Sequence, residues 1–111
     1  MLKQIAVSFA GAALVAASLG ANAAIDDKKA LEMLTKGGCT ACHNIDKKGV
    51  GPAYKDVAKK RKGEKDATAM LAKKVRDGGS GAYGPIPMPP NAKDKMSDDD
   101  INTIVAWVLA L

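Results

Sequence analysis

A short motif of cysteine and histidine is the feature that most constrains the fold of this chain. Its two cysteines, Cys39 and Cys42, are followed at once by its single histidine, His43. This pattern, C-x-x-C-H, is the attachment signature of c-type haem. Two thiols one helical turn apart can each form a thioether to one porphyrin, and His43 would then be the proximal iron ligand. The fold would therefore enclose a large, flat, apolar group.

Three other interpretations of the motif explain less of the sequence. A zinc site needs one or two further ligands, and the chain contains no second histidine and no third cysteine. A thioredoxin-like redox motif is expected in a βαβ context, which this sequence lacks. A plain disulfide leaves the adjacent His43 without a role. Haem attachment is therefore the favoured interpretation.

The first 23 residues have the pattern of a secretory signal peptide. Lys3 precedes an apolar run, and the run ends in Ala21-Asn22-Ala23, a small-residue cleavage pattern, so we expect cleavage after Ala23. A transmembrane anchor is the alternative, but two serines and two glycines interrupt the run, which would span a membrane poorly. The sequence thus predicts one exported domain, residues 24–111, with no stable membrane insertion after cleavage.

That domain has few large side chains from which to build a core. Its aromatic residues are Tyr54, Tyr83 and Trp107, and many of its apolar residues are alanines. A domain of this size buries a modest fraction of its surface, and a poor core usually requires a disulfide, a metal or a cofactor. A haem at the centre of the fold would supply the missing apolar bulk.

The spacing of apolar residues predicts an all-α domain without strands. Leu31 lies on the predicted apolar face of the first helix and Met70 on that of the third. Trp107 is expected in the core where the first and last helices cross. Ser97 is the expected N-cap of the last helix, with three aspartates in its first turn. The helices are predicted from Asp26 or Asp27 to about residue 36, from near Pro52 to Gly63, from about Asp66 to Asp77, and from Ser97 to the end of the chain.

Met88 is the second informative residue. It lies in the run 84–91, whose four prolines exclude a helix and restrict the backbone. The run could be a rigid linker or a polyproline recognition segment, but neither explains a thioether at its centre. A six-coordinate haem that carries electrons needs a second axial ligand, and a stiff loop loses little entropy in presenting one. We therefore expect Met88 to be that ligand.

The charge of the chain is positive. It has 17 Lys and Arg residues against 12 Asp and Glu, with a formal net charge of +5, and the densest cationic run is residues 59–62. Nucleic-acid binding is disfavoured because the chain is predicted to be exported and the run has no interleaved aromatic residues. A solvated helix end and the steering of acidic partners both remain open for these side chains.

Together these motifs resemble those of small bacterial class I monohaem c-type cytochromes, the short periplasmic type. The likeness rests on residues 38–43, 50–57, 84–91 and 106–109. It implies a cytochrome c fold of four to five short helices around one haem, bound covalently through Cys39 and Cys42. It implies His43 and Met88 as axial ligands. It also implies a monomeric periplasmic electron carrier, not an enzyme, that passes electrons to terminal reductases or oxidases, which we expect to present acidic docking surfaces.

The resemblance implies four supporting contacts as well. The carbonyl of Pro52 would accept a hydrogen bond from the His43 ring, and the Asn91 side chain would donate one near the Met sulfur. Tyr83 and Lys74 would contact a haem propionate, at positions where the family usually has Trp and Arg. The alternative function is a ligand-binding sensor or peroxidase-like protein with a labile Met ligand.

Overall fold

The computed structural model describes residues 25–111, so the predicted signal peptide and its cleavage site lie outside the described residues. Within this range there is no strand, and one isolated bridge joins Gly79 to Met88. The all-α prediction is confirmed. The elements are the helices α1 (Asp27–Lys36), α2 (Tyr54–Arg61), α3 (Ala67–Asp77) and α4 (Asp98–Leu109), and the short 3-10 helix η1 (Cys39–Ala41).

None of the helices in residues 25–111 is long and apolar enough to cross a membrane.

Side-chain caps begin the first and last helices, as the sequence predicts. An Asp26 carboxylate oxygen accepts a hydrogen bond from the Lys29 amide at 2.7 Å. The Ser97 hydroxyl accepts one from the Asp100 amide at 3.1 Å. Each bond satisfies an amide that the helix itself leaves unpaired, and the aspartates of the first turns suit the positive end of the helix dipole.

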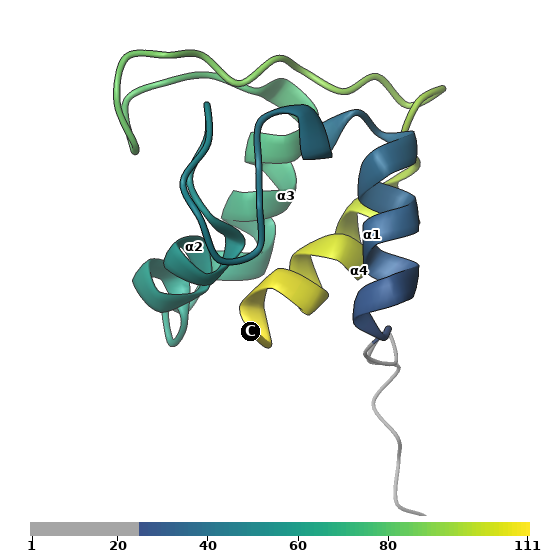
Figure 1. Cartoon of the computed structure of the whole chain (residues 1–111), viewed down its shortest axis with the longest axis horizontal. Coiled ribbons are helices and arrows are strands. Elements are labelled where there is room, and N and C mark those ends of the chain that lie inside the picture. The colour runs from purple at the N-terminus through teal and green to yellow at the C-terminus, as the bar shows by residue number, and fades with distance from the viewer. Residues whose placement is uncertain (1–24) are drawn as a thin grey trace, which may run out of the picture.

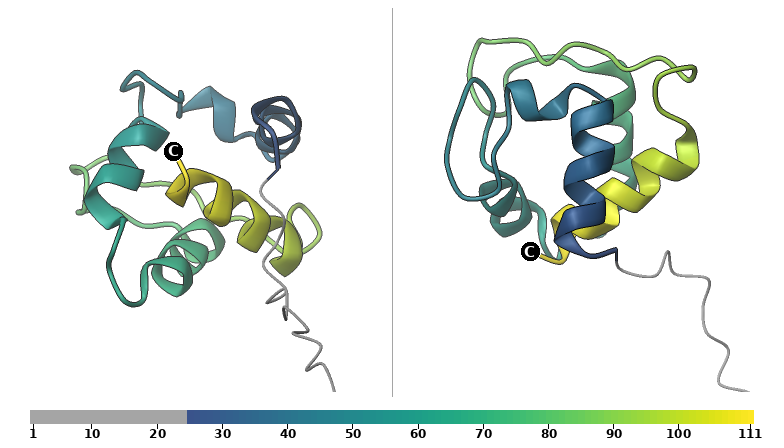
Figure 2. Two further views of the ribbon diagram at one scale, coloured as in Figure 1. Left: turned by 90° about the horizontal axis from the view of Figure 1, so that it is seen from below. Right: turned by 45° about the vertical axis from the view of Figure 1, so that its right-hand side comes forward.

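Helix α4 forms the centre of the core and packs against α1, α2 and α3 (Figures 1 and 2). Trp107 is buried on α4, and its indole N–H donates to the Asp27 carboxylate on α1 at 2.9 Å. The indole also meets the Tyr54 ring of α2 edge to face, with centroids 5.6 Å apart. The predicted place of Trp107 in the core, where α1 and α4 meet, is confirmed.

The boundaries of the two middle helices differ slightly from the prediction. Helix α2 begins at Tyr54, two residues after Pro52, because its first amides donate to the loop carbonyls of Asn44 and Ile45. It ends at Arg61, before residue 63, since Lys62 is already extended. Helix α3 begins one residue later than predicted, at Ala67.

Two residues predicted on apolar faces are not buried. Helix α1 buries Ala30 and Leu34, which lie one turn apart, and leaves Leu31 at the edge of this face with 40% of its surface exposed. Met70 on α3 is 45% exposed. It lies on the wall of a pocket rather than in the core.

Candidate functional site

A pocket of about 340 Å3 opens between η1, α3 and the loop that follows α3. Its volume falls within the range of roughly 300–1,000 Å3 that is common for ligand pockets. Most of its wall is apolar and is formed by residues such as Val50, Leu71, Val75 and Ile86. The fold brings seven of the eight predicted site residues to this wall: Cys39, Cys42, His43, Pro52, Lys74, Tyr83 and Met88.

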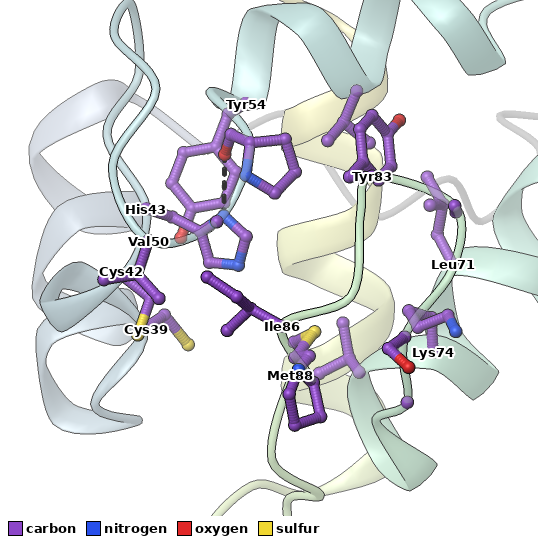
Figure 3. Close-up of a pocket in the computed structure, with 18 of the residues that line it drawn as sticks. Cys39, Cys42, His43, Val50, Tyr54, Leu71, Lys74, Tyr83, Ile86 and Met88 are labelled. Carbon is purple, nitrogen blue, oxygen red and sulfur yellow. Dashed lines mark hydrogen bonds between the residues drawn. The ribbon is translucent and has the colours of Figure 1, made fainter.

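Hydrogen bonding orients the His43 ring. Its Nδ1 lies 2.7 Å from the carbonyl oxygen of Pro52. Because a carbonyl only accepts, the proton of this bond is on Nδ1, and the neutral ring therefore has its lone pair on Nε2. The other ring nitrogen faces into the pocket, on the side of Ile86 and Met88 (Figure 3). An unprotonated imidazole nitrogen aimed into a cavity is a metal ligand in the required tautomer.

Close packing also holds this ring. A Cβ atom on Gly51 would lie 2.6 Å from Cε1 of His43, so only glycine lets the backbone pass so near the imidazole. The Tyr54 ring stacks on the imidazole, with centroids 5.1 Å apart and an interplanar angle of 25°. Burial raises the pKa of the Tyr54 phenol far above its usual range. The sequence favours a packing role for Tyr54, but neither its contact with His43 nor that of Gly51 was identified, although Gly51 directly precedes Pro52 in one of the motifs.

The two cysteines lie beside His43 on the same side of the pocket (Figure 3). Both are half-buried free thiols on or next to η1, and the His43 amide donates to the Cys39 carbonyl at 3.0 Å. Burial raises the pKa of the Cys39 thiol above its ordinary value. No group of three His, Cys, Asp or Glu side chains that could hold a metal occurs in residues 25–111, so the zinc interpretation gains no third ligand there.

Met88 points into the pocket from the other side, with its sulfur toward His43 (Figure 3). Two backbone hydrogen bonds of 2.9 and 3.0 Å pair it with Gly79, just after α3. Farther along the loop, the buried Asn91 side chain donates to the Val75 carbonyl at 2.8 Å. Asn91 thus acts behind the pocket wall, where it ties the loop to α3. Its predicted hydrogen bond near the Met sulfur remains a prediction.

Arg76 completes this attachment and was not singled out in the sequence. Its Nη1 donates to the carbonyls of Asn91 and Met96 at 2.9 and 2.7 Å, and its Nη2 pairs with the Asp98 carboxylate at 2.6 Å. Asn91 lies in the Met88 loop, Met96 precedes α4, and Asp98 is the first residue of α4. One guanidinium on α3 therefore joins α3, the Met88 loop and α4. A charged side chain at this distance from the motifs gives no local sequence signal.

The opening of the pocket carries several cations. Lys74 extends from α3, and Tyr83 extends from the opposite part of the loop (Figure 3). Lys60 lies 4.6 Å from the centre of the Tyr83 ring and donates to the Ala82 carbonyl at 3.1 Å. Arg61 belongs to the cationic run 59–62, which was predicted to be solvated or to steer partners. It is less exposed than the lysines of this run. Its side chain is only 18% exposed and lines the pocket.

The residues of the pocket fit a covalently attached haem. They supply two thiols, an imidazole in the coordinating tautomer and a thioether, which are the groups that c-type haems use. The apolar wall suits a porphyrin face. The lining residues in the described part of the chain include Lys48, Arg61 and Lys74 and no acid, which suits the two carboxylates of a haem.

Comparisons with known proteins identify the family of the chain. Residues 19–111 match the family Cytochrome c. Cytochrome c-551 of Pseudomonas aeruginosa is 56% identical over 73 residues, which are 66% of this chain and 67% of that protein. The crystal structure of wild-type cytochrome c552 of Nitrosomonas europaea superposes with a TM-score of 0.68 at 43% identity, over 73% of this chain and 98% of that one.

A class 1 cytochrome, MtoD of Sideroxydans lithotrophicus, superposes with a TM-score of 0.67 at 32% identity, over 78% of this chain and 97% of its own. The family match, the relatives and the all-α fold lead to one conclusion. The chain belongs to the cytochrome c family, whose members bind haem covalently, and is a small class I monohaem cytochrome that transfers electrons.

Proposed function

We propose that this protein is a one-electron shuttle whose single haem is bound through Cys39 and Cys42 and ligated axially by His43 and Met88. When bound, the haem supplies an iron that alternates between its ferrous and ferric states. The observation that carries the proposal is the convergence of two thiols, an imidazole and a thioether on one apolar pocket.

The first task of the protein is to keep the imidazole still. His43 is hydrogen-bonded to Pro52, stacked on Tyr54 and packed against the Gly51 backbone. A ligand held by its second nitrogen keeps its tautomer and ring orientation, which also raises its strength as a donor. Electron transfer is favoured by such a site because little has to rearrange when the charge of the iron changes.

The second task is to keep the thioether in place. The Met88 loop is pinned by the paired hydrogen bonds with Gly79 and by the attachment of Asn91 to α3. Prolines on both sides of Met88 further limit its motion. A sensor or peroxidase-like protein needs an open or labile axial position, which these restraints oppose. We therefore propose an electron carrier with no substrate chemistry of its own.

Location and partners follow from sequence and surface together. The signal-peptide pattern supports export to the periplasm. Val50 and Ile86 line the pocket and have 56% and 63% of their surfaces exposed, and Lys48 and Lys74 line it too. An exposed apolar patch beside lysines suits brief contact with an acidic redox partner. We propose that the protein acts there as a monomer, between a donor and a terminal reductase or oxidase.

The decisive experiment compares two methionines of the same pocket. Wild-type holoprotein should have a six-coordinate, low-spin spectrum with a thioether-to-iron band in the ferric state. Met88→Ala should lose that band and bind added imidazole or carbon monoxide. Met70→Ala is the control, because Met70 lines the pocket but is assigned no iron contact, and it should keep the wild-type spectrum. An unchanged spectrum in the Met88 variant would refute the ligand assignment.

Covalent attachment is tested separately. Replacing both Cys39 and Cys42 by Ala should give a chain that carries no haem on a denaturing gel, whereas the wild-type band should stain for haem. A wild-type chain that loses its haem on that gel would refute thioether attachment.

A further inference from the structure

We propose that Arg61, the last residue of α2, is a further haem-binding residue that holds a propionate carboxylate and tunes the redox potential. This inference rests on the proposed haem site. Tyr83 and Lys74 were expected to contact a propionate, whereas Arg61 was predicted to be a solvated or steering cation. Its place in the structure differs from that of the exposed Lys59 on the same helix.

The position of Arg61 on α2 explains why its side chain is largely covered, with only 18% of its surface exposed. Tyr54, Val57 and Ala58 form the buried face of the helix. Arg61 follows Val57 and Ala58 by four and three residues, so it continues the same face. It therefore extends along the pocket wall, whereas the neighbouring Lys59 and Lys60 lie on exposed faces.

The hydrogen bonding of Arg61 is incomplete. Its Nη1 reaches the Glu64 carboxylate oxygens at 3.2 and 3.5 Å. Its Nε is buried and has no hydrogen-bond partner within the described residues. Buried guanidinium donors are normally satisfied, because an unpaired one costs its full desolvation free energy. A side chain on a pocket wall with a spare buried donor suits an acceptor that enters the pocket.

The surroundings of Arg61 favour a carboxylate as that acceptor. Burial raises the pKa of the Tyr83 phenol, and the positive charge of Arg61 opposes this rise. The two side chains are therefore close to one another. Lys60 fixes Tyr83 from outside through its ring and the Ala82 carbonyl. Arg61 therefore shares the pocket wall with the two expected propionate contacts, and none of the described lining residues is acidic. A guanidinium is better suited than an ammonium to bind a carboxylate through two donors.

The sign of the effect on the potential follows from charge. A cation beside the haem disfavours the ferric state, which has one more positive charge, so Arg61 raises the potential. Glu64 opposes this effect because it offsets part of the guanidinium charge and competes for its donors. Substitutions at the two positions should therefore move the potential in opposite directions.

The test uses purified holoprotein and matched charge controls. Arg61→Leu should lower the midpoint potential more than Lys59→Leu does, since Lys59 is an exposed cation of the same helix. Glu64→Gln should raise it more than Glu32→Gln, an exposed isosteric control on α1. In resonance Raman spectra, Arg61→Leu should shift the propionate bending band, Lys59→Leu should leave it in place, and Arg61→Lys should give an intermediate shift.

Equal potentials and unshifted propionate bands in the Arg61→Leu and Lys59→Leu proteins would overturn the inference. If Arg61→Leu does not fold, Arg61→Lys and Glu64→Gln decide it by the same two measurements. Failure of the proposed haem site would look different, because the wild-type protein itself would then lack covalent haem or the His and Met ligand spectrum.

Discussion

Substitution of Gly51 by alanine tests how the protein holds its proximal ligand. The new methyl carbon would lie 2.6 Å from Cε1 and 2.9 Å from Nδ1 of His43, well inside van der Waals contact. Either the imidazole or the backbone of residue 51 must move. Because Pro52 is the next residue, both movements disturb the 2.7 Å hydrogen bond between its carbonyl and the ring.

The expected loss of stability combines three effects. Overpacking of a tight site costs about 1–3 kcal/mol. Weakening of the hydrogen bond adds about 0.5–1.5 kcal/mol. Alanine has less conformational freedom than glycine in the unfolded chain, which favours the folded state and offsets about 0.4–1 kcal/mol of this loss. The free energy of unfolding should therefore fall by about 2 kcal/mol, within a range of about 0.5–4 kcal/mol. A fall of about 2 kcal/mol lowers the urea midpoint by roughly 1 M for a small domain.

Urea unfolding of the holoprotein, followed by circular dichroism, measures this change. The control is Gly37→Ala, whose new Cβ would meet its nearest neighbour, Cys39 Sγ, at an ordinary 3.4 Å. The φ of Gly37 is −80°, which alanine adopts readily. We expect the control to change the stability by about 1 kcal/mol or less. If both variants unfold at the same urea concentration, His43 is not packed against Gly51 as described.

Three further predictions concern contacts outside the haem ligands. Asp27→Ala leaves the buried indole N–H of Trp107 without its acceptor, so urea unfolding should show a loss of about 1–3 kcal/mol. The hydrogen bond from Arg76 holds the pKa of the Asp98 carboxyl below its ordinary 3.8. The ion pair therefore stabilises the folded protein fully above pH 3.8, and this stabilisation is lost as the pH falls through the lower pKa of the folded state. Asp98→Asn should flatten this acid dependence of the urea midpoint. Asn91→Ala removes the side-chain hydrogen bond that helps to tie the Met88 loop to α3, while the bonds between Arg76 and the backbone of residue 91 stay. Titration should therefore show tighter binding of imidazole to the ferric protein.

Each of these predictions has a distinct contradiction. Asp99→Ala removes an equivalent first-turn aspartate from α4, and an equal loss in this variant would assign the Asp27 effect to the helix dipole. An acid limb that Asp98→Asn leaves unchanged would exclude its ion pair with Arg76 as the cause. Unchanged imidazole affinity after Asn91→Ala would mean that other contacts hold the loop.

Local patterns predicted the helices well where their own residues satisfy their ends. Asp26 and Ser97 cap α1 and α4 as expected, because an N-cap is decided within three residues. The start of α2 was less predictable, since carbonyls of the preceding loop receive its first amides. Burial of apolar residues was predicted least well on α3, where Met70 lies on a pocket wall instead of in the core.

The sequence by itself determined the family and the chemistry of the cofactor. Thiols, imidazole and thioether occur in two short motifs, and the spacing within such motifs is covalent and local. Only the tertiary structure decided that the Gly51 backbone packs against the His43 ring, that Asn91 donates to α3, and that Arg61 alone in its cationic run lines the pocket. These contacts depend on which helix faces and loops meet in space. The sequence does not distinguish Arg61 from the neighbouring lysines, because only the packing of α2 decides which of these side chains is covered and which are exposed.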